Sequence, residues 1–227
     1  MTEQNSSSSR REDLSAAKRA LLEKRLGGKT APSSTQGIPR YPDAERIPLS
    51  FAQERLWFLH QLDPESPAYN MYNVVRLQGE LNTSLLTNCF EVLINRHAVF
   101  RTCFVTQDEQ PNQQVASSVE FNIPVVELGS SGPENRLQES QQLIKTEISR
   151  PFDLTQSPLI RAVLIKQSDH EHVLVLTIHH IIFDEWSNEL FWKEISEVYK
   201  ALSKGEEPDF PELMIQYSDF SIWQKRE

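Results

Sequence analysis

Apolar positions along this chain repeat with two different periods, one typical of helices and one typical of strands. Repeats at three and four residues predict helices between Ser50 and Pro64, after Asn82, over 133–149, from Trp186 to Gly205 and from Tyr217 onward. Alternating or continuously apolar runs predict strands over 72–81, 100–107, 119–128, 159–166 and 172–180. The polar residues 108–114 are expected to form a turn.

Local signals at the ends of these segments support the assignment. Ser50 and Gln53 have the sequence pattern of a capping box, and Asn82 is a candidate cap for the next helix. The strand at 172–180 is apolar at nearly every position, which is typical of a central strand covered on both faces. It follows the strand at 159–166 after a short polar segment, as in an antiparallel hairpin. These elements predict an α/β fold, an α+β sandwich in which helices cover a mixed sheet.

Residues 1–46 differ from the rest of the chain, and we expect them to be a flexible N-terminal segment. A short helix is predicted near 14–26, followed at 29–43 by a stretch rich in Pro, Ser and Gly that is typical of a linker. The helix is either solvated or contacts a neighbouring domain or partner chain, and both interpretations stay open. The packed region is expected over 47–227.

Composition and charge narrow the class of protein. The chain has 227 residues, 38% of them hydrophobic and 24% charged, with a formal net charge of −9. This acidic balance argues against a general binder of nucleic acid or of anionic membranes. There is no apolar run of about 18 residues and no apolar signal-peptide core, so we predict a cytoplasmic protein without a membrane span. Cys89 and Cys103 fall in different predicted elements and are expected to be reduced thiols.

The most chemically suggestive stretch is TIHHIIFDEWS, residues 177–187. If the strand continues through His179 and His180, their side chains point to opposite faces, which is poor geometry for a shared metal ion. No metal site is therefore predicted. Either histidine is suited to acid–base chemistry, although the residues alone favour a hydrogen-bonded core histidine. Asp184 could cap the following helix, form an ion pair that shapes the turn, or orient a catalytic imidazole.

Several segments, in this order, resemble the condensation domain of nonribosomal peptide synthetases, a member of the chloramphenicol-acetyltransferase-like superfamily. They are LSFAQERLWFLHQLDPESPAYNM (49–71), NRHAVFRTCF (95–104), RPFDLTQSPLIRAVLI (150–165), HHIIFDEWS (179–187) and YSDFSIWQ (217–224). A single His-His-x-x-x-Asp would be weak evidence, whereas five ordered segments are specific. The resemblance implies a chloramphenicol-acetyltransferase-like lobe over 47–227, the N-terminal, donor-side lobe of the domain, with the C-terminal lobe absent.

The resemblance also implies an activity and partners. The family transfers an acyl or peptidyl group from the thioester of an upstream donor carrier protein to the amine of an aminoacyl group on a downstream acceptor carrier, next to an adenylation domain. Both substrates arrive on phosphopantetheine arms, and the domain itself is expected to bind no cofactor. His180 matches the catalytic histidine, which acts as a base or positions the amine.

The same match gives supporting, structural roles to the remaining motif residues. These are His179, Asp184, Glu185, Trp186, Ser187, Arg101 and His97. Asp184 is expected to pair with an arginine, either Arg101 or one beyond this chain.

Two departures from the family pattern lead to alternatives. Glu185 stands where the family usually has Gly, and an isolated first lobe would have only half of the substrate tunnel. We therefore expect the isolated lobe to be inactive. Alternatives are a non-catalytic lobe that binds carrier proteins, impaired by Glu185 or by truncation, and a stand-alone acyltransferase of the same superfamily. The histidine pair argues against heterocyclisation, and the first segment looks more like condensation than epimerisation.

Overall fold

The computed structural model describes residues 37–42, 44–129 and 132–227. Residues Ile38–Glu227 form a compact unit. The segment before β1 (Ile47–Pro48) is bound to the body of this unit. The backbone N–H of Tyr41 donates to Asp219 Oδ1 at 2.6 Å, and Arg40 forms an ion pair with Glu212. The helix predicted near 14–26 lies outside the described residues.

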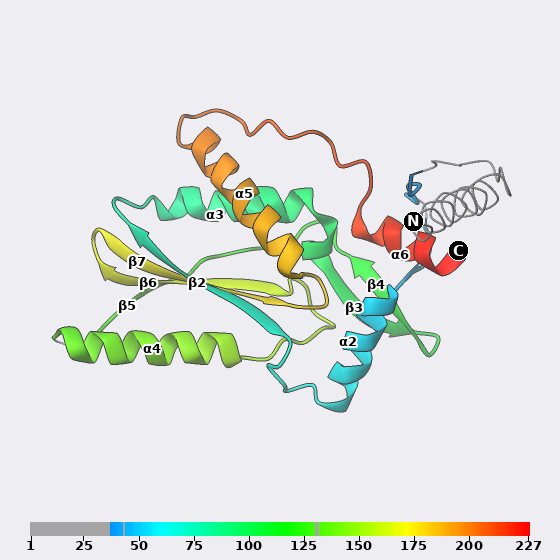
Figure 1. The fold of residues 1–227 in the computed structure, drawn as a ribbon, viewed down its shortest axis with the longest axis horizontal. Coiled ribbons are helices and arrows are strands. Elements are labelled where there is room, and N and C mark those ends of the chain that lie inside the picture. The colour runs from blue at the N-terminus through cyan, green and yellow to red at the C-terminus, as the bar shows by residue number, and fades with distance from the viewer. Residues whose placement is uncertain (1–36, 43, 130–131) are drawn as a thin grey trace, which may run out of the picture. The chain divides into compact units, whose positions relative to one another are not determined.

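The rest of the described chain contains helices, single strands and two strand hairpins. In order, they are α2 (Phe51–Leu62), β2 (Asn70–Gln78), α3 (Thr83–Arg96), the 3-10 helix η1 (Ala98–Arg101), β3 (Thr102–Gln107), β4 (Gln110–Val115), β5 (Val125–Glu127), α4 (Pro133–Ser149), β6 (Ile160–Ser168), β7 (Glu171–His179), α5 (Glu185–Leu202) and α6 (Tyr217–Arg226). The strands form a four-stranded sheet, in the order β2-β7-β6-β5, and a three-stranded sheet, in the order β1-β4-β3. Helix α4 covers one face of the larger sheet, and α3 and α5 cover the other (Figure 1). The expected α/β class, a mixed sheet covered by helices, is confirmed.

The central position of strand β7 explains why its sequence is apolar almost throughout. It lies between β2 and β6, antiparallel to both. Leu174 and Leu176 are fully buried in the main core on the side of α3 and α5, whereas Val175 belongs to a second cluster that includes Ile144 of α4. Because both faces of the sheet are covered, successive side chains of β7 are buried, and the predicted central strand and hairpin are confirmed.

Two predicted segments differ most from the structure, and both have weak strand patterns. Residues 108–114 were expected to be a turn, but only Asp108 and Glu109 turn, with φ of 50° and 63°, and β4 follows at once. Positive φ at both positions matches the twist of a two-residue hairpin. β4 carries polar side chains, so its sequence lacks the alternation of an ordinary strand. The strand expected over 119–128 is only β5, which pairs in parallel with β6.

Candidate active site

The two histidines at the end of β7 face different surroundings. His179 is the last residue of the strand and is buried, with 3% of its surface exposed, whereas His180 follows in a turn and is exposed. The backbone N–H of His179 donates to the Leu159 carbonyl at 3.0 Å, and that of His180 donates to the Tyr69 carbonyl at 2.8 Å. Backbone bonds to two neighbouring segments therefore hold the pair at the end of the sheet, with one imidazole inside and one outside.

His180 is held in a form that leaves one ring nitrogen free to act. Its Nδ1 lies 2.6 Å from the carbonyl oxygen of Phe183, which can only accept a hydrogen bond. Nδ1 therefore carries the proton, and in the neutral ring Nε2 keeps its lone pair. The side chains of Ile181, Ile182 and Phe183 are buried and anchor the turn that presents this carbonyl. His180 can accept a proton through Nε2 without reorienting.

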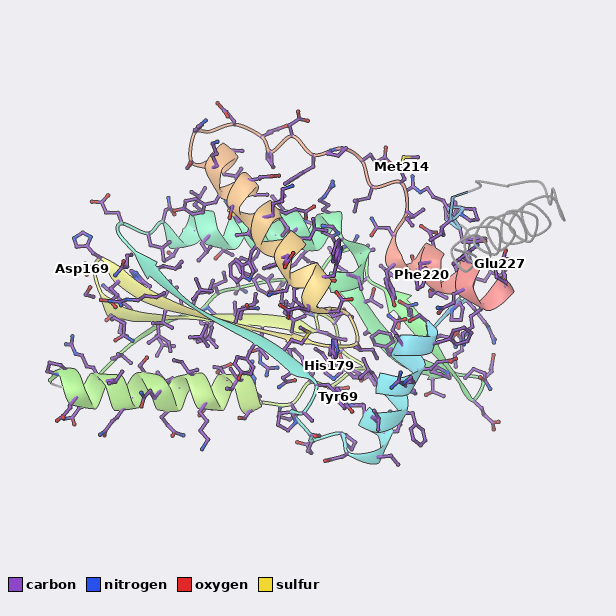
Figure 2. All side chains as sticks on the ribbon, in the orientation of Figure 1. Tyr69, Asp169, His179, Met214, Phe220 and Glu227 are labelled. Atoms are coloured by element: carbon purple, nitrogen blue, oxygen red, sulfur yellow. The ribbon has the colours of Figure 1, made fainter. Side chains whose placement is uncertain are left out.

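His179 is enclosed and kept neutral. Its Nδ1 accepts from the backbone N–H of Ile181 at 3.1 Å, and Tyr69 lies beside its ring, as Figure 2 shows, with ring centroids 6.4 Å apart. The ring of Phe152 meets it edge-on at 6.1 Å. Burial, and after it the positive charges of His60, His180 and Arg161, lower the pKa of His179 to about 3. A neutral, buried imidazole of this kind shapes the turn rather than exchanging protons.

The lowered pKa of His179 predicts a pH dependence of stability. Its ordinary pKa is 6.5, so below pH 6.5 the unfolded chain binds a proton that the folded chain excludes down to about pH 3. The free energy of unfolding should therefore fall as the pH falls through this window, by up to about 1.4 kcal/mol per pH unit from this group. Urea unfolding between pH 4 and pH 7 should show a shallower fall in His179→Gln, which cannot take up the proton. Identical slopes in both proteins would contradict the assignment.

Asp184 is the N-cap of α5. Its carboxylate Oδ1 accepts from the backbone N–H of Ser187 at 2.8 Å and from the Ser187 hydroxyl at 2.6 Å. Burial acts to raise the pKa of Asp184, but the hydrogen bonds from Ser187 and the charge of His180 outweigh it, so the pKa is lowered. Of the roles left open by the sequence, the structure supports a helix cap that joins the His180 turn to α5.

Arg101 does not form the expected pair with Asp184. Its guanidinium instead donates to backbone carbonyls: to Ile94 at 3.1 Å, to Asn95 at 3.3 Å, and to Ala116 and Ser117 after β4. Helix ends leave carbonyls without partners, and a guanidinium with several donors can satisfy those at the end of α3. The alternative partner for Asp184, an arginine beyond this chain, stays a prediction.

His97 lies at the end of α3 and pairs with a buried carboxylate. Its Nε2 is 2.6 Å from Glu194 Oε2, and Arg96 Nε is 3.5 Å from Glu194 Oε1. Glu194 is on α5 and is only 7% exposed. The three side chains fasten α3 to α5, and His97 and Glu194 also line a pocket next to the His180 groove. His97 therefore lies at the junction of α3 and α5, and the supporting role expected of it stays a prediction.

A groove of ≈250 Å³ opens in front of His180. Asp184 and Ser187 line it, together with Gln53 and Tyr217, which the sequence reasoning did not connect with the site. Gln53 and Tyr217 lie in two of the segments that resemble the family, and Gln53 is also part of the capping box. The amide Nε2 of Gln53 lies 3.4 Å from the Ile181 carbonyl. Five separate segments, namely α2, η1, the His180 turn, α5 and α6, therefore build this groove.

Glu185 and Trp186 form the first turn of α5. Glu185 is the first residue of the helix and is exposed, with no positive φ, so its backbone does not require glycine. A carboxylate in the first turn also interacts favourably with the helix dipole. Trp186 is 81% exposed. The substitution of Glu for the usual Gly is therefore compatible with the local backbone.

Two further observations concern only the described part of the chain. Within it, no three His, Cys, Asp or Glu side chains come together in an arrangement that could hold a metal ion. None of its helices has the length and apolar character needed to cross a membrane.

Cys89 and Cys103 are buried free thiols, and burial raises the pKa of Cys89 to about 11. Their burial fits the expected core thiols, and their reduced state stays a prediction.

Comparison with known sequences identifies relatives over most of the chain. A family model described as "Condensation domain" matches residues 43–227. The chain is 41% identical over 184 residues to chondramide synthase cmdD of Chondromyces crocatus, covering 81% of this chain and 5% of that protein. It is 37% identical over 214 residues to phosphinothricin tripeptide synthetase PhsC of Streptomyces viridochromogenes, covering 94% of this chain and 20% of that protein. The chain thus spans a small part of these relatives.

Solved structures share the fold. The chain resembles the X-domain in its complex with OxyB from teicoplanin biosynthesis with a TM-score of 0.75 and 25% identity, over 84% of this chain and 40% of that one. It resembles the starter condensation domain of rhizomide synthetase RzmA with a TM-score of 0.71 and 22% identity, over 81% of this chain and 44% of that one. The described fold therefore corresponds to less than half of either structure.

Proposed function

The chain belongs to the condensation-domain family, and we propose that it supplies the donor-side half of a domain that forms amide bonds in nonribosomal peptide synthesis. The observation that carries this proposal is the geometry of His180, whose Nδ1 is bound to the Phe183 carbonyl, so that Nε2 is the free ring nitrogen of a side chain that lines the groove. The resemblance of five ordered segments to the family supports the same activity.

The proposed reaction joins an amine to a thioester. An α-amino group has a pKa of about 7.7 to 8.0, so near neutral pH much of it is protonated and cannot attack. His180 Nε2 accepts a proton from this amine, whose nitrogen then attacks the thioester carbonyl carbon. Collapse of the tetrahedral intermediate breaks the C–S bond, and the proton that the attacking nitrogen loses passes to the leaving sulfur, so that an amide and the free pantetheine thiol result. A base placed in this way contributes roughly 10² to 10⁴ to the rate, and holding the amine in position adds to it.

The proposed reaction also requires partner domains that lie outside this chain. The donor group arrives on an upstream carrier protein and the acceptor on a downstream one, each on a phosphopantetheine arm, with an adenylation domain alongside and the whole in the cytoplasm. His180 is exposed in this chain, and the part of the chain that matches the two solved structures covers only 40% and 44% of them. The isolated chain is inactive in this proposal, because a second half is needed to exclude water from the groove.

A direct assay separates this function from its alternatives. The assay uses the parent enzyme, meaning the complete protein that contains this chain in the proposal. It is supplied with a thioester-loaded donor carrier and an aminoacyl-loaded acceptor carrier, and the mass of the acceptor is followed by intact-protein mass spectrometry. We expect the donor group to appear on the acceptor, and not when the acceptor carries a 2-hydroxyacyl group with no amine. Transfer only to a free soluble amine would support a stand-alone acyltransferase. No transfer to either acceptor would support a non-catalytic carrier-binding lobe.

Glu185 offers a separate test of whether this site is impaired. Because Glu185 is exposed and helical, we expect Glu185→Gly in the parent enzyme to change the transfer rate by less than about threefold, the range of an ordinary surface substitution. Glu185→Gln keeps the side-chain volume and serves as the matched control for charge. A large gain in the Gly variant alone would show that the side chain obstructs the site. A gain in both variants would assign the obstruction to the negative charge.

A further inference from the structure

An apolar pocket of ≈100 Å³ lies beside the His180 groove, between η1, the His180 turn and the start of α5. Its walls include Val99, Phe100, Phe183, Leu190 and Phe191. Phe100, Phe183 and Phe191 are buried and pack against one another edge-on or at a tilt, with ring centroids 5.8 to 6.2 Å apart. Rigid aromatic packing of this kind gives the pocket a defined shape.

The pocket and the groove are neighbours. Val99, Ile182, Phe183 and Ser187 border both of them, and His180 borders the groove. A side group attached close to an atom that reacts at His180 therefore lies next to the pocket. The pocket has the position of a subsite for a group attached close to the reacting atom.

The polar groups at the edge of the pocket favour an uncharged occupant. Glu194 borders it, but this carboxylate is already paired with His97 and with Arg96. A cationic group would have to lose its hydration without gaining a free carboxylate, which is unfavourable. At the rim, Trp186 is 81% exposed and Leu190 is 46% exposed, so an aliphatic group would remove apolar surface from water.

We propose that this pocket binds a short aliphatic group, of about four carbons, from one of the two substrates of the proposed reaction. An engineered cavity of about 150 Å³ holds benzene, so ≈100 Å³ corresponds to about four carbon atoms. The inference rests on the proposed function for the identity of the substrates. The aliphatic group belongs either to the donor acyl chain or to the side chain of the acceptor amino acid.

Calorimetric titration of the 227-residue chain distinguishes these sources without requiring turnover. The donor-like probes are N-acetylcysteamine thioesters of acetic, butanoic, pentanoic and octanoic acids, and the acceptor-like probes are those of glycine, norvaline, norleucine and leucine. In one of the two series, donor-like or acceptor-like, the affinity should rise about fourfold per methylene and level off near four carbons. The series that shows this rise identifies which substrate carries the aliphatic group. Affinity that is independent of chain length in both series would overturn the proposal.

A variant pair locates the effect in the pocket. Leu190→Trp fills the pocket from its exposed rim, so it should lower the affinity for the best-fitting probe at least about tenfold, equivalent to two buried methylenes. Leu137→Trp is the control, because Leu137 is a similarly exposed leucine on α4, at the opposite face of the sheet. Equal affinities for Leu190→Trp and the parent chain would show that the group binds elsewhere.

The outcomes also separate this inference from the proposed function. Chain-length dependence that is lost in Leu190→Trp, in a parent enzyme that forms no amide, would support the pocket and contradict the function. Amide formation by a protein whose probe affinity does not depend on chain length would support the function and contradict the pocket.

Discussion

Replacement of His180 with Ala should lower the rate of amide formation between loaded carriers by about 10² to 10⁴-fold in the parent enzyme. The loss follows from the tautomer, since Nδ1 donates to the Phe183 carbonyl and Nε2 is then the atom available to take a proton from the amine. Stability should change little, because the His180 side chain is exposed. Single-turnover transfer followed by intact-protein mass spectrometry measures the effect.

The control for this substitution is His170→Ala. His170 is also exposed but lies in the turn between β6 and β7, at the other end of the hairpin from His180. We expect its transfer rate to equal that of the parent enzyme. An unchanged rate in His180→Ala would contradict the proposed role of this histidine.

The pH profile of His180→Ala distinguishes a base from a group that only positions the amine. If His180 removes a proton, the rate of the variant should recover steadily as the pH rises above about 8, where the acceptor amine loses its proton to water. A rate that stays low at all pH values would instead assign His180 to placement of the amine. Both outcomes keep His180 in the site, but they assign it different chemistry.

Replacement of Phe90 with Ala should lower the free energy of unfolding by about 3 to 5 kcal/mol. Phe90 is fully buried on α3, stacks on Phe121 at a centroid distance of 5.4 Å and meets Phe191 of α5 edge-on at 5.6 Å. Removing its ring leaves a cavity at the junction between α3, α5 and the segment before β5. Because α5 carries Asp184 as its N-cap, the His180 turn depends on this packing.

Phe58→Ala provides the matched control, because Phe58 on α2 is 62% exposed. We expect a change within about 0.5 kcal/mol, as for an ordinary surface position. Urea unfolding of the 227-residue chain, monitored by circular dichroism, measures both variants. Similar losses in the two variants would show that Phe90 is not part of the core.

Local sequence patterns predicted much of the framework. Capping boxes and helical periodicity act within four residues, so Ser50 and Asn82 could be recognised as caps directly. The uninterrupted apolar run of β7 indicated a central strand because both faces had to be buried. Patterns failed where a strand depends on a distant partner. β4 is polar and relies on its hairpin, and β5 pairs in parallel with β6 through a connection that includes α4.

The site shows the same division. Strand geometry predicted that His179 and His180 would face opposite ways, but only the packed structure decided which one is buried. Asp184 as a cap was among the local interpretations of the sequence, whereas the carbonyl partners of Arg101 depend on how α3 meets the segment after β4.

The sequence by itself therefore determined the order of most elements, their caps and the family motif, because these depend on neighbours within a few residues. The tertiary structure alone decided the free nitrogen of His180, the reach of Gln53 to the Ile181 carbonyl and the pocket beside the groove. Each of these arises where elements distant in the chain come together, and burial and hydrogen bonding across such contacts are set by packing rather than by local periodicity.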